Sequence, residues 1–195
     1  MHNLKFLVLT LGLALTVTAC GAPPKADLDA AKGATDTAVT AGASEYAAAS
    51  MKAVEDAQAA LDAELNAQEG NWLKSYTKAT ELAAAVKAAG EKAAADASGG
   101  KDAAKNDATA AIAEVKTLLT DAQALLDKAP KGKGTAADIE AMKTDLTTAG
   151  SAITEAEAAL AEGKFLDAKA KAQSALATAT TVKTAVEAAM AAKKR

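Results

Sequence analysis

The side chains that most often carry out enzyme chemistry are scarce in this chain. His2 is the only histidine and Cys20 is the only cysteine among 195 residues. His2 lies in an N-terminal segment that we expect to be removed, so the working protein would lack the commonest general base near neutral pH and the commonest zinc ligand. The composition therefore disfavours catalysis by a histidine or a thiol, and it offers no zinc site of the usual kind.

Carboxylates are the remaining candidates for acid–base chemistry or for binding a hard cation. Glu155 and Glu157 form one closely spaced pair, and Asp27 and Asp29 form another. A spacing of two places the members of each pair on different faces of a helix, so they are expected to be ordinary solvated side chains. Residues 99–101 read Gly-Gly-Lys but lack the spacing and the preceding strand of a phosphate-binding loop. We therefore predict no catalytic residue, no metal and no cofactor.

Three aromatic residues are candidates for core packing or for lining a binding groove. Trp72 and Tyr76 are four residues apart, which places them on one face of a predicted helix, and Phe165 occupies a similar position later in the chain. Of the two roles, we favour burial in the core. If Trp72 is buried, its replacement by alanine is expected to cost about 3–5 kcal/mol of stability.

The residues around Cys20 indicate a covalent attachment. Lys5 precedes an apolar run over residues 6–16, which is too short to span a bilayer stably but has the length of the apolar region of a signal peptide. Residues 17–20 read Val-Thr-Ala-Cys, a pattern that resembles the lipobox of bacterial lipoproteins. The resemblance implies cleavage before Cys20, a diacylglycerol thioether on its sulfur, and an acyl chain such as palmitate on its new amino group. A free thiol or an intermolecular disulfide is the alternative for Cys20.

Charge and length limit what the processed chain binds. Removal of residues 1–19 would leave 176 residues with a net charge of −4, which is a normal size for one domain or two small ones. Mild acidity argues against nucleic acid as a partner, because phosphate binding requires a basic surface. A single cysteine also excludes an internal disulfide.

Alanine dominates the apolar half of the composition, and aromatic residues make up only 3%. Alanine is the best helix former but buries little area, so the sequence specifies helices strongly and their packing weakly. We predict an all-α fold, an antiparallel helical bundle of helical hairpins with alanine-rich, coiled-coil-like packing. The predicted parts are a signal peptide at 1–19, a tether at 20–25, an N-terminal helical hairpin at 26–97 and a three-helix segment at 102–192.

Glycines predict where the helices end. A helix over 26–68 either breaks near Gly42 or continues as one long helix, and Gly70 in a left-handed conformation is expected to end it. The next helix is predicted over 72–97. Ser-Gly-Gly at 98–100 is the clearest helix breaker in the chain and is expected to separate the two halves.

Apolar stripes predict the buried faces of the three later helices. The helix predicted over 102–128 has the strongest stripe, and the two that follow repeat at the seven-residue spacing of coiled coils. The stripe of the first comprises Ile112, Val115, Leu118, Leu119, Ala122, Leu125 and Leu126; that of the second, Ile139, Met142, Leu146, Ala149, Ile153, Ala156 and Leu160; and that of the third, Phe165, Ala168, Ala172, Ala175, Ala179, Val182, Val186 and Ala189.

Two segments of the chain echo each other. Residues 69–73 and 162–166 match in pattern, each with a glycine followed two residues later by an aromatic residue, which predicts a helical hairpin in which the ring packs on the preceding helix. The run over 159–168 resembles the hairpin turn of tetratricopeptide-like repeats. The separation of the two copies does not match the repeat of a regular solenoid, which is about 34 residues.

A second resemblance covers about residues 24–97. Leu-Asp-Ala-Ala-Lys at 28–32, Tyr46-Ala47 and the stretch from Leu61 through Gly70 to Trp72 resemble an uncharacterised family of alanine-rich helical domains. Members of this family occur in envelope lipoproteins of Gram-negative bacteria, so the resemblance implies an envelope location.

These observations predict a non-enzymatic, lipid-anchored protein with a structural, scaffolding or partner-binding role. Gly21 follows the cysteine where retention at the inner membrane usually needs aspartate, so we expect the outer membrane, facing the periplasm. The expected partners are the membrane itself, an envelope protein and a second copy of the chain. Two alternatives stay open: a hairpin-repeat module that binds a peptide or glycan, and an alanine-rich stress or desiccation protein that is disordered until dried or bound.

Overall fold

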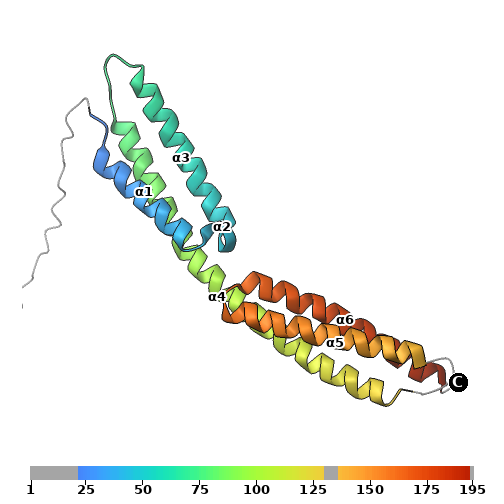
Figure 1. Cartoon of the computed structure of the whole chain (residues 1–195). Helices are drawn as coiled ribbons and strands as arrows, with labels where there is room; N and C mark the ends of the chain where they lie inside the picture. The colour runs from blue at the N-terminus through green and yellow to red at the C-terminus, as the bar shows by residue number, and fades with distance from the viewer. Residues whose placement is uncertain (1–21, 130–135, 194–195) are drawn as a thin grey trace, which may run out of the picture. The chain divides into compact units, whose positions relative to one another are not determined.

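The computed structural model describes residues 22–129 and 136–193, and all regular elements in these two ranges are α-helices (Figure 1). They are α1 (Lys25–Thr40), α2 (Ala43–Tyr46), α3 (Ala48–Glu69), α4 (Thr77–Asp127), α5 (Ala136–Ala161) and α6 (Phe165–Lys193). The all-α helical bundle predicted from composition is therefore confirmed. The leader and Cys20 lie outside the described residues, so the structure does not bear on the predicted cleavage or lipidation.

The helices form two compact units. The N-terminal unit comprises the chain up to Thr40 together with Ala49–Ala93, and the C-terminal unit comprises Ala41–Ala48 together with the chain from Ala94 onward. Helix α4 contributes its first part to the N-terminal unit and its second part to the C-terminal unit.

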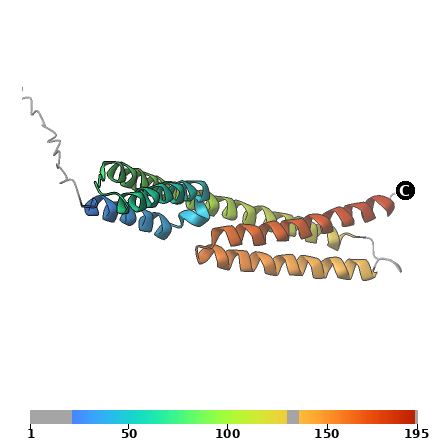
Figure 2. The ribbon, with the colours of Figure 1, turned by 90° about the horizontal axis from the view of Figure 1, so that it is seen from above.

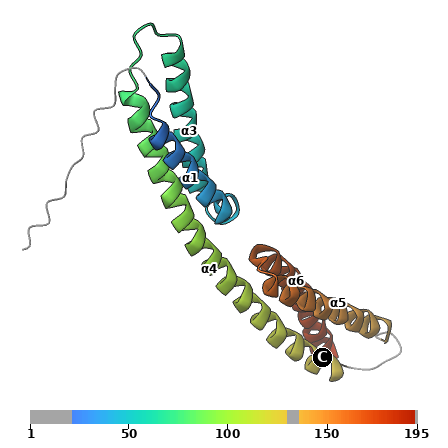
Figure 3. The ribbon, with the colours of Figure 1, turned by 60° about the vertical axis from the view of Figure 1, so that its left-hand side comes forward.

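In the N-terminal unit, α3 packs antiparallel to α1 and to the first part of α4 (Figure 3). The chain reverses between α1 and α3 at Gly42, whose φ of 84° lies in the left-handed region that glycine tolerates best. Of the two alternatives for residues 26–68, the break near Gly42 is therefore correct and one long helix is wrong. One cluster of its core comprises Ala31, Leu61, Ala79, Ala83 and Val86.

Small residues bring α1 and α4 into backbone contact. A Cβ atom on Gly90 would lie 2.7 Å from the carbonyl carbon of Ala34, closer than real Cβ atoms approach. The glycine is therefore required for this close approach of two helices. Helices lined by larger side chains pack with their axes about 8–10 Å apart, and alanine and glycine permit the lower end of that range.

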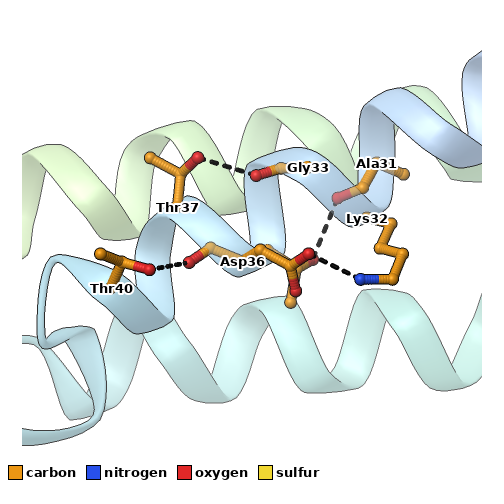
Figure 4. Close-up of polar contacts among 7 residues, drawn as sticks. Ala31, Lys32, Gly33, Asp36, Thr37 and Thr40 are labelled. Atoms are coloured by element: carbon orange, nitrogen blue, oxygen red, sulfur yellow. Dashed lines mark hydrogen bonds and ion pairs between the residues drawn. The ribbon is translucent and has the colours of Figure 1, made fainter.

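Exposed polar side chains of α1 form hydrogen bonds and an ion pair within the helix itself (Figure 4). Thr37 Oγ1 donates to the Gly33 carbonyl at 2.7 Å, and Lys32 Nζ donates to Asp36 Oδ2 at 2.6 Å. The lysine–carboxylate pair stabilises the helix by about 0.2–0.5 kcal/mol, whereas the threonine hydroxyl only finds a partner on its own helix. Neither contact carries information about the neighbouring helices. Packing specificity in this unit must therefore come from the buried face.

In the C-terminal unit, the second part of α4 packs with α5 and α6 (Figure 2). The predicted stripes are confirmed, because nearly all of their residues are buried or partly buried in this unit. Residues Val115, Ala122, Leu126, Ala156, Ala168, Ala172, Ala179, Val182 and Val186 are each at most 2% exposed. Alanine supplies much of this core, as the composition predicts.

Ion pairs connect the three helices of the C-terminal unit at its surface. Lys116 of α4 pairs with Glu157 of α5, Lys169 of α6 pairs with Asp107 of α4 at 2.8 Å, and Lys171 of α6 pairs with Glu155 of α5 at 2.9 Å. Exposed pairs of this kind contribute about 0–1 kcal/mol each. Each pair joins two different helices, so the pairs agree with the register in which the buried faces pack.

The helix break predicted at residues 98–100 is wrong, because α4 runs without interruption through all three residues. A Cβ atom on Gly100 would lie 2.2 Å from the carbonyl oxygen of Tyr46, whereas a Cβ on Gly99 would meet nothing within 4 Å. Gly100 is thus needed for close packing of α4 against the segment that contains Tyr46. A glycine in a helix interior costs about 1 kcal/mol relative to alanine. At Gly100 the close packing offsets this cost, whereas Gly99 makes no such contact.

The two neighbouring glycines provide a matched test. Gly100→Ala should destabilise the protein by about 1–3 kcal/mol, because the new methyl group overlaps the Tyr46 backbone. Gly99→Ala should stabilise it by about 0.5–1 kcal/mol through helix propensity alone. Urea unfolding followed by circular dichroism measures both. Equal midpoints for the two variants would show that Gly100 does not serve a close contact.

Candidate functional site

Glu155 and Glu157, the closely spaced carboxylates of the sequence, lie on the surface and do not form a shared site. Glu155 pairs with Lys171 of α6, whereas Glu157 pairs with Lys116 of α4, so the two side chains serve different neighbours. The hydrogen bond from Lys171 to Glu155, and then the charge of that carboxylate, raise the pKa of the lysine. Both glutamates thus act as partners in surface ion pairs.

Within residues 22–129 and 136–193, the interior is apolar throughout. No buried polar or charged residue and no metal-binding group of three or more His, Cys, Asp or Glu side chains occurs there. In the same part of the chain, no helix combines the length and apolar character needed to cross a membrane.

The prediction that Trp72 belongs to a helix core is wrong. Trp72 lies in the loop over residues 70–76, its side chain is 100% exposed, and α4 begins only at Thr77. The neighbouring Leu73 is 83% exposed. Tyr76, in contrast, is partly buried against the core of the N-terminal unit, so the two aromatic residues do not share a role.

A single amide side chain fixes the loop that carries Trp72. Gln68 Oε1 accepts hydrogen bonds from the Ser75 backbone N–H at 3.0 Å and from Asn71 Nδ2 at 3.3 Å. The same side chain donates from Nε2 to Glu64 at 2.8 Å. These contacts tie both sides of the loop to the last turn of α3. The loop is therefore closed at its base, and Trp72 and Leu73 form its tip.

Glu64 links this base to α4. Its carboxylate accepts from Gln68 and pairs with Lys78 Nζ at 3.2 Å. The hydrogen bond with Gln68, and then the contact with Lys78, lower the pKa of Glu64. The carboxylate therefore stays ionised when the loop takes this conformation.

The second copy of the echoed pattern folds differently. Gly163 has a φ of 78°, its N–H donates to the Leu160 carbonyl at 3.1 Å, and the Lys164 N–H donates to the Ala159 carbonyl at 2.9 Å. These are the two hydrogen bonds of a Schellman motif, which ends α5. Phe165 then begins α6 at once, and its ring is buried at 9% exposure.

The expectation of a left-handed Gly70 is wrong, because among the described residues positive φ values occur only at Gly42 and Gly163. The residues that follow each glycine explain why the segments at Gly70 and Gly163 differ in conformation. Asn71 and Ser75 bond to Gln68 and hold an extended loop, whereas Phe165 has a buried site immediately after its glycine. The two segments are similar in sequence and different in structure.

Tyr46 contacts the turn between α5 and α6 through Phe165, and the sequence did not predict this contact. Burial, and then the neighbouring Glu45 carboxylate, raise the pKa of the Tyr46 hydroxyl, whereas a hydrogen bond from the Phe165 backbone N–H opposes the rise. No sequence signal connects positions so far apart. The Tyr46 backbone also packs closely against Gly100, where a Cβ atom would lie 2.2 Å from the Tyr46 carbonyl oxygen.

Two open grooves lie on the C-terminal unit. One has a volume of about 530 Å³ between α4 and α5, with Leu119 and Leu146 among its lining residues, and the other has about 480 Å³ between α4 and α6, with Leu118 and Leu176. Exposed threonines and carboxylates border both. Neither Trp72, Tyr76 nor Phe165 lines either groove, so the predicted aromatic groove is not supported.

Comparison with known protein families, with curated proteins and with solved structures finds no match for this chain. The resemblances to bacterial lipoproteins and to alanine-rich envelope domains therefore stay predictions from sequence.

The two echoed aromatic residues should respond oppositely to truncation. Phe165→Ala should cost about 3–5 kcal/mol, because it removes a buried ring at the α5–α6 turn. Trp72→Ala should change the free energy of unfolding by no more than about 0.5 kcal/mol, because the ring makes no core contact. Chemical unfolding followed by circular dichroism measures both. A large loss of stability in the Trp72 variant would contradict the exposed position.

Removal of the Gln68 amide should loosen the loop base. Gln68→Ala is expected to destabilise the protein by about 0.5–1.5 kcal/mol and to speed hydrogen exchange at the Ser75 amide, which loses its acceptor. Gln58→Ala is the matched control, because Gln58 bonds only to Asp62 on its own helix. If Ser75 exchanges equally fast in both variants, Gln68 does not hold the loop.

Proposed function

We propose that this chain is a non-catalytic, lipid-anchored envelope protein whose helical units have a structural, scaffolding or partner-binding role. The observation that carries the proposal is the position of Cys20. It follows an apolar leader and precedes the first residue of α1 by five positions, so a lipid on its sulfur would hold the bundle by one end. The role proposed for Cys20 is covalent attachment of the chain to a membrane lipid.

The lipid expected on Cys20 suits stable anchoring. One acyl chain binds a membrane only marginally, whereas two or more hold a protein stably. The diacylglycerol thioether supplies two chains and the acylated amino group supplies a third. Gly21, in place of the aspartate that favours the inner membrane, supports an outer-membrane location facing the periplasm.

The packing of the helices supports a structural role. In the C-terminal unit, α5 and α6 have 26 and 29 residues, so at about 1.5 Å per residue they are roughly 39 and 44 Å long. Their buried faces consist largely of small side chains, and lysine–carboxylate pairs lie at their surface. Long helices of this kind present extended lateral surfaces to an envelope partner or to a second copy of the chain.

Metabolic labelling with a palmitate analogue tests the anchor. The full chain expressed in a bacterium should incorporate the label and sediment with membranes, whereas Cys20→Ser should do neither, because it lacks the sulfur that accepts the diacylglycerol. Cys20→Ala, which has neither the thiol of cysteine nor the hydroxyl of serine, is the matched control and should also take up no label. Label in the serine variant at the level of the natural chain would overturn the proposal.

The scaffold role requires a partner. Crosslinking in intact cells, followed by affinity purification in mild detergent, should recover one reproducible envelope protein or a dimer of this chain with the natural protein. The Cys20→Ser variant, which the anchor no longer holds at the membrane, should lose a partner that is bound there. Recovery of monomer alone would count against a scaffold and favour a generic surface role.

A further inference from the structure

The start of α1 and the loop between α3 and α4 lie at the same end of the N-terminal unit (Figures 1 and 3). This follows from the antiparallel order of its helices. Helix α1 runs away from that end, α3 returns to it, and α4 leaves it again. Residues 22–24, which lead into α1, therefore share an end with the loop over residues 70–76.

That loop carries the two most exposed large apolar side chains of the described residues. Trp72 is 100% exposed and Leu73 is 83% exposed, compared with 54% for Val39 and 41% for Leu166. Trp72 and Leu73 are adjacent, so they form one apolar tip rather than two scattered contacts. An exposed tryptophan beside an exposed leucine is costly in water unless another apolar phase receives both side chains.

The loop over residues 70–76 is fixed at its base and exposed at its tip. Gln68 accepts from Ser75 on one side and from Asn71 on the other, so the base is closed while the tip points away from the helices. The ring of Trp72 thus has no site within its own unit, although Tyr76, four residues later, packs on the core. The local hydrogen bonds favour the exposed position of the tip.

The tether places this end of the unit close to the lipid. The Pro24 residue is buried, and its carbonyl accepts from the N–H groups of Asp27 and Leu28 at 3.0 Å, so the chain is fixed to the bundle from Pro24 onward. Four residue steps separate Cys20 from Pro24, and even a fully extended chain of that length spans only about 14 Å. A lipid on Cys20 would therefore hold the end that carries the loop within reach of the bilayer.

We propose that the Trp72–Leu73 tip inserts into the boundary between headgroups and acyl chains of the same bilayer that holds the Cys20 lipid. This inference rests on the proposed anchoring. Tryptophan is enriched at this depth because its ring is apolar while its N–H keeps a polar partner. The lipid and the tip would give the N-terminal unit two separate membrane contacts, which restrict its orientation in a way that one flexible tether does not.

The tip carries its own probe, because Trp72 is the only tryptophan in the chain. The full acylated protein is purified in detergent and reconstituted into vesicles of equimolar phosphatidylethanolamine and phosphatidylglycerol. Emission of Trp72 should move to shorter wavelength, its quenching by aqueous iodide should fall severalfold, and phospholipids brominated near the headgroup should quench it. In Leu73→Asp, which places a charge beside the ring, these changes should be largely lost.

Val39→Asp is the matched control. Val39 is an exposed apolar residue in the last turn of α1, at the other end of the same unit, so its change to aspartate should leave Trp72 emission as in the natural chain. Thermal unfolding of both variants separates an effect on the bilayer contact from an effect on folding. A Trp72 signal that responds equally to both substitutions would contradict the inference.

Mass spectrometry of the same samples separates the inference from the anchor on which it rests. Acyl chains on Cys20, together with Trp72 emission typical of water and full quenching by iodide, would overturn the inserted tip alone. Absence of acyl chains would overturn the anchor and the inference together. A shift to shorter wavelength without quenching by brominated lipid would show that another part of the protein or a second copy covers Trp72, and this would also overturn insertion.

Discussion

Close approach of helix backbones is the constraint on which this protein depends. A core built mainly from alanine has little side-chain area to bury, so its helices gain stability only if they come close together over long stretches. Gly90 against Ala34 and Gly100 against the Tyr46 carbonyl mark the places where even a methyl group would not fit. Steric exclusion at these points selects one packing among several that alanine alone would allow.

The polar groups complement this packing without entering it. Most threonine hydroxyls of the described helices bond to a carbonyl four residues earlier, and most lysine–carboxylate pairs on the N-terminal unit lie within one helix. Contacts between helices are few and specific, such as Lys171 with Glu155 and Glu64 with Lys78. Helix formation and helix arrangement are thus governed by separate sets of residues, the first abundant and the second sparse.

This separation explains what could be predicted from sequence. Heptad spacing identified the buried faces around Ile153 and Val182, because a period is a local property. The break expected at Gly99 and Gly100 was wrong, since glycine marks both turns and close contacts, and only the tertiary partner distinguishes them. The core position predicted for Trp72 is wrong for a similar reason, because the hydrogen bonds by which Gln68 holds the base of the loop have no signature in the sequence. The lipid on Cys20 stays a prediction.

The segment Ala41–Ala48 interleaves the two units along the sequence. It belongs to the C-terminal unit, yet in sequence it stands between α1 and α3 of the N-terminal unit, while α4 contributes to both. No single cut in the gene separates the two units, and neither could be exchanged between proteins as one continuous piece. During synthesis or export, the contacts of Tyr46 form only after Gly100, and then Phe165, have been made or exported, because both residues lie later in the chain. The two units are therefore interleaved along the sequence, and the C-terminal unit completes its packing only when both of its segments are present.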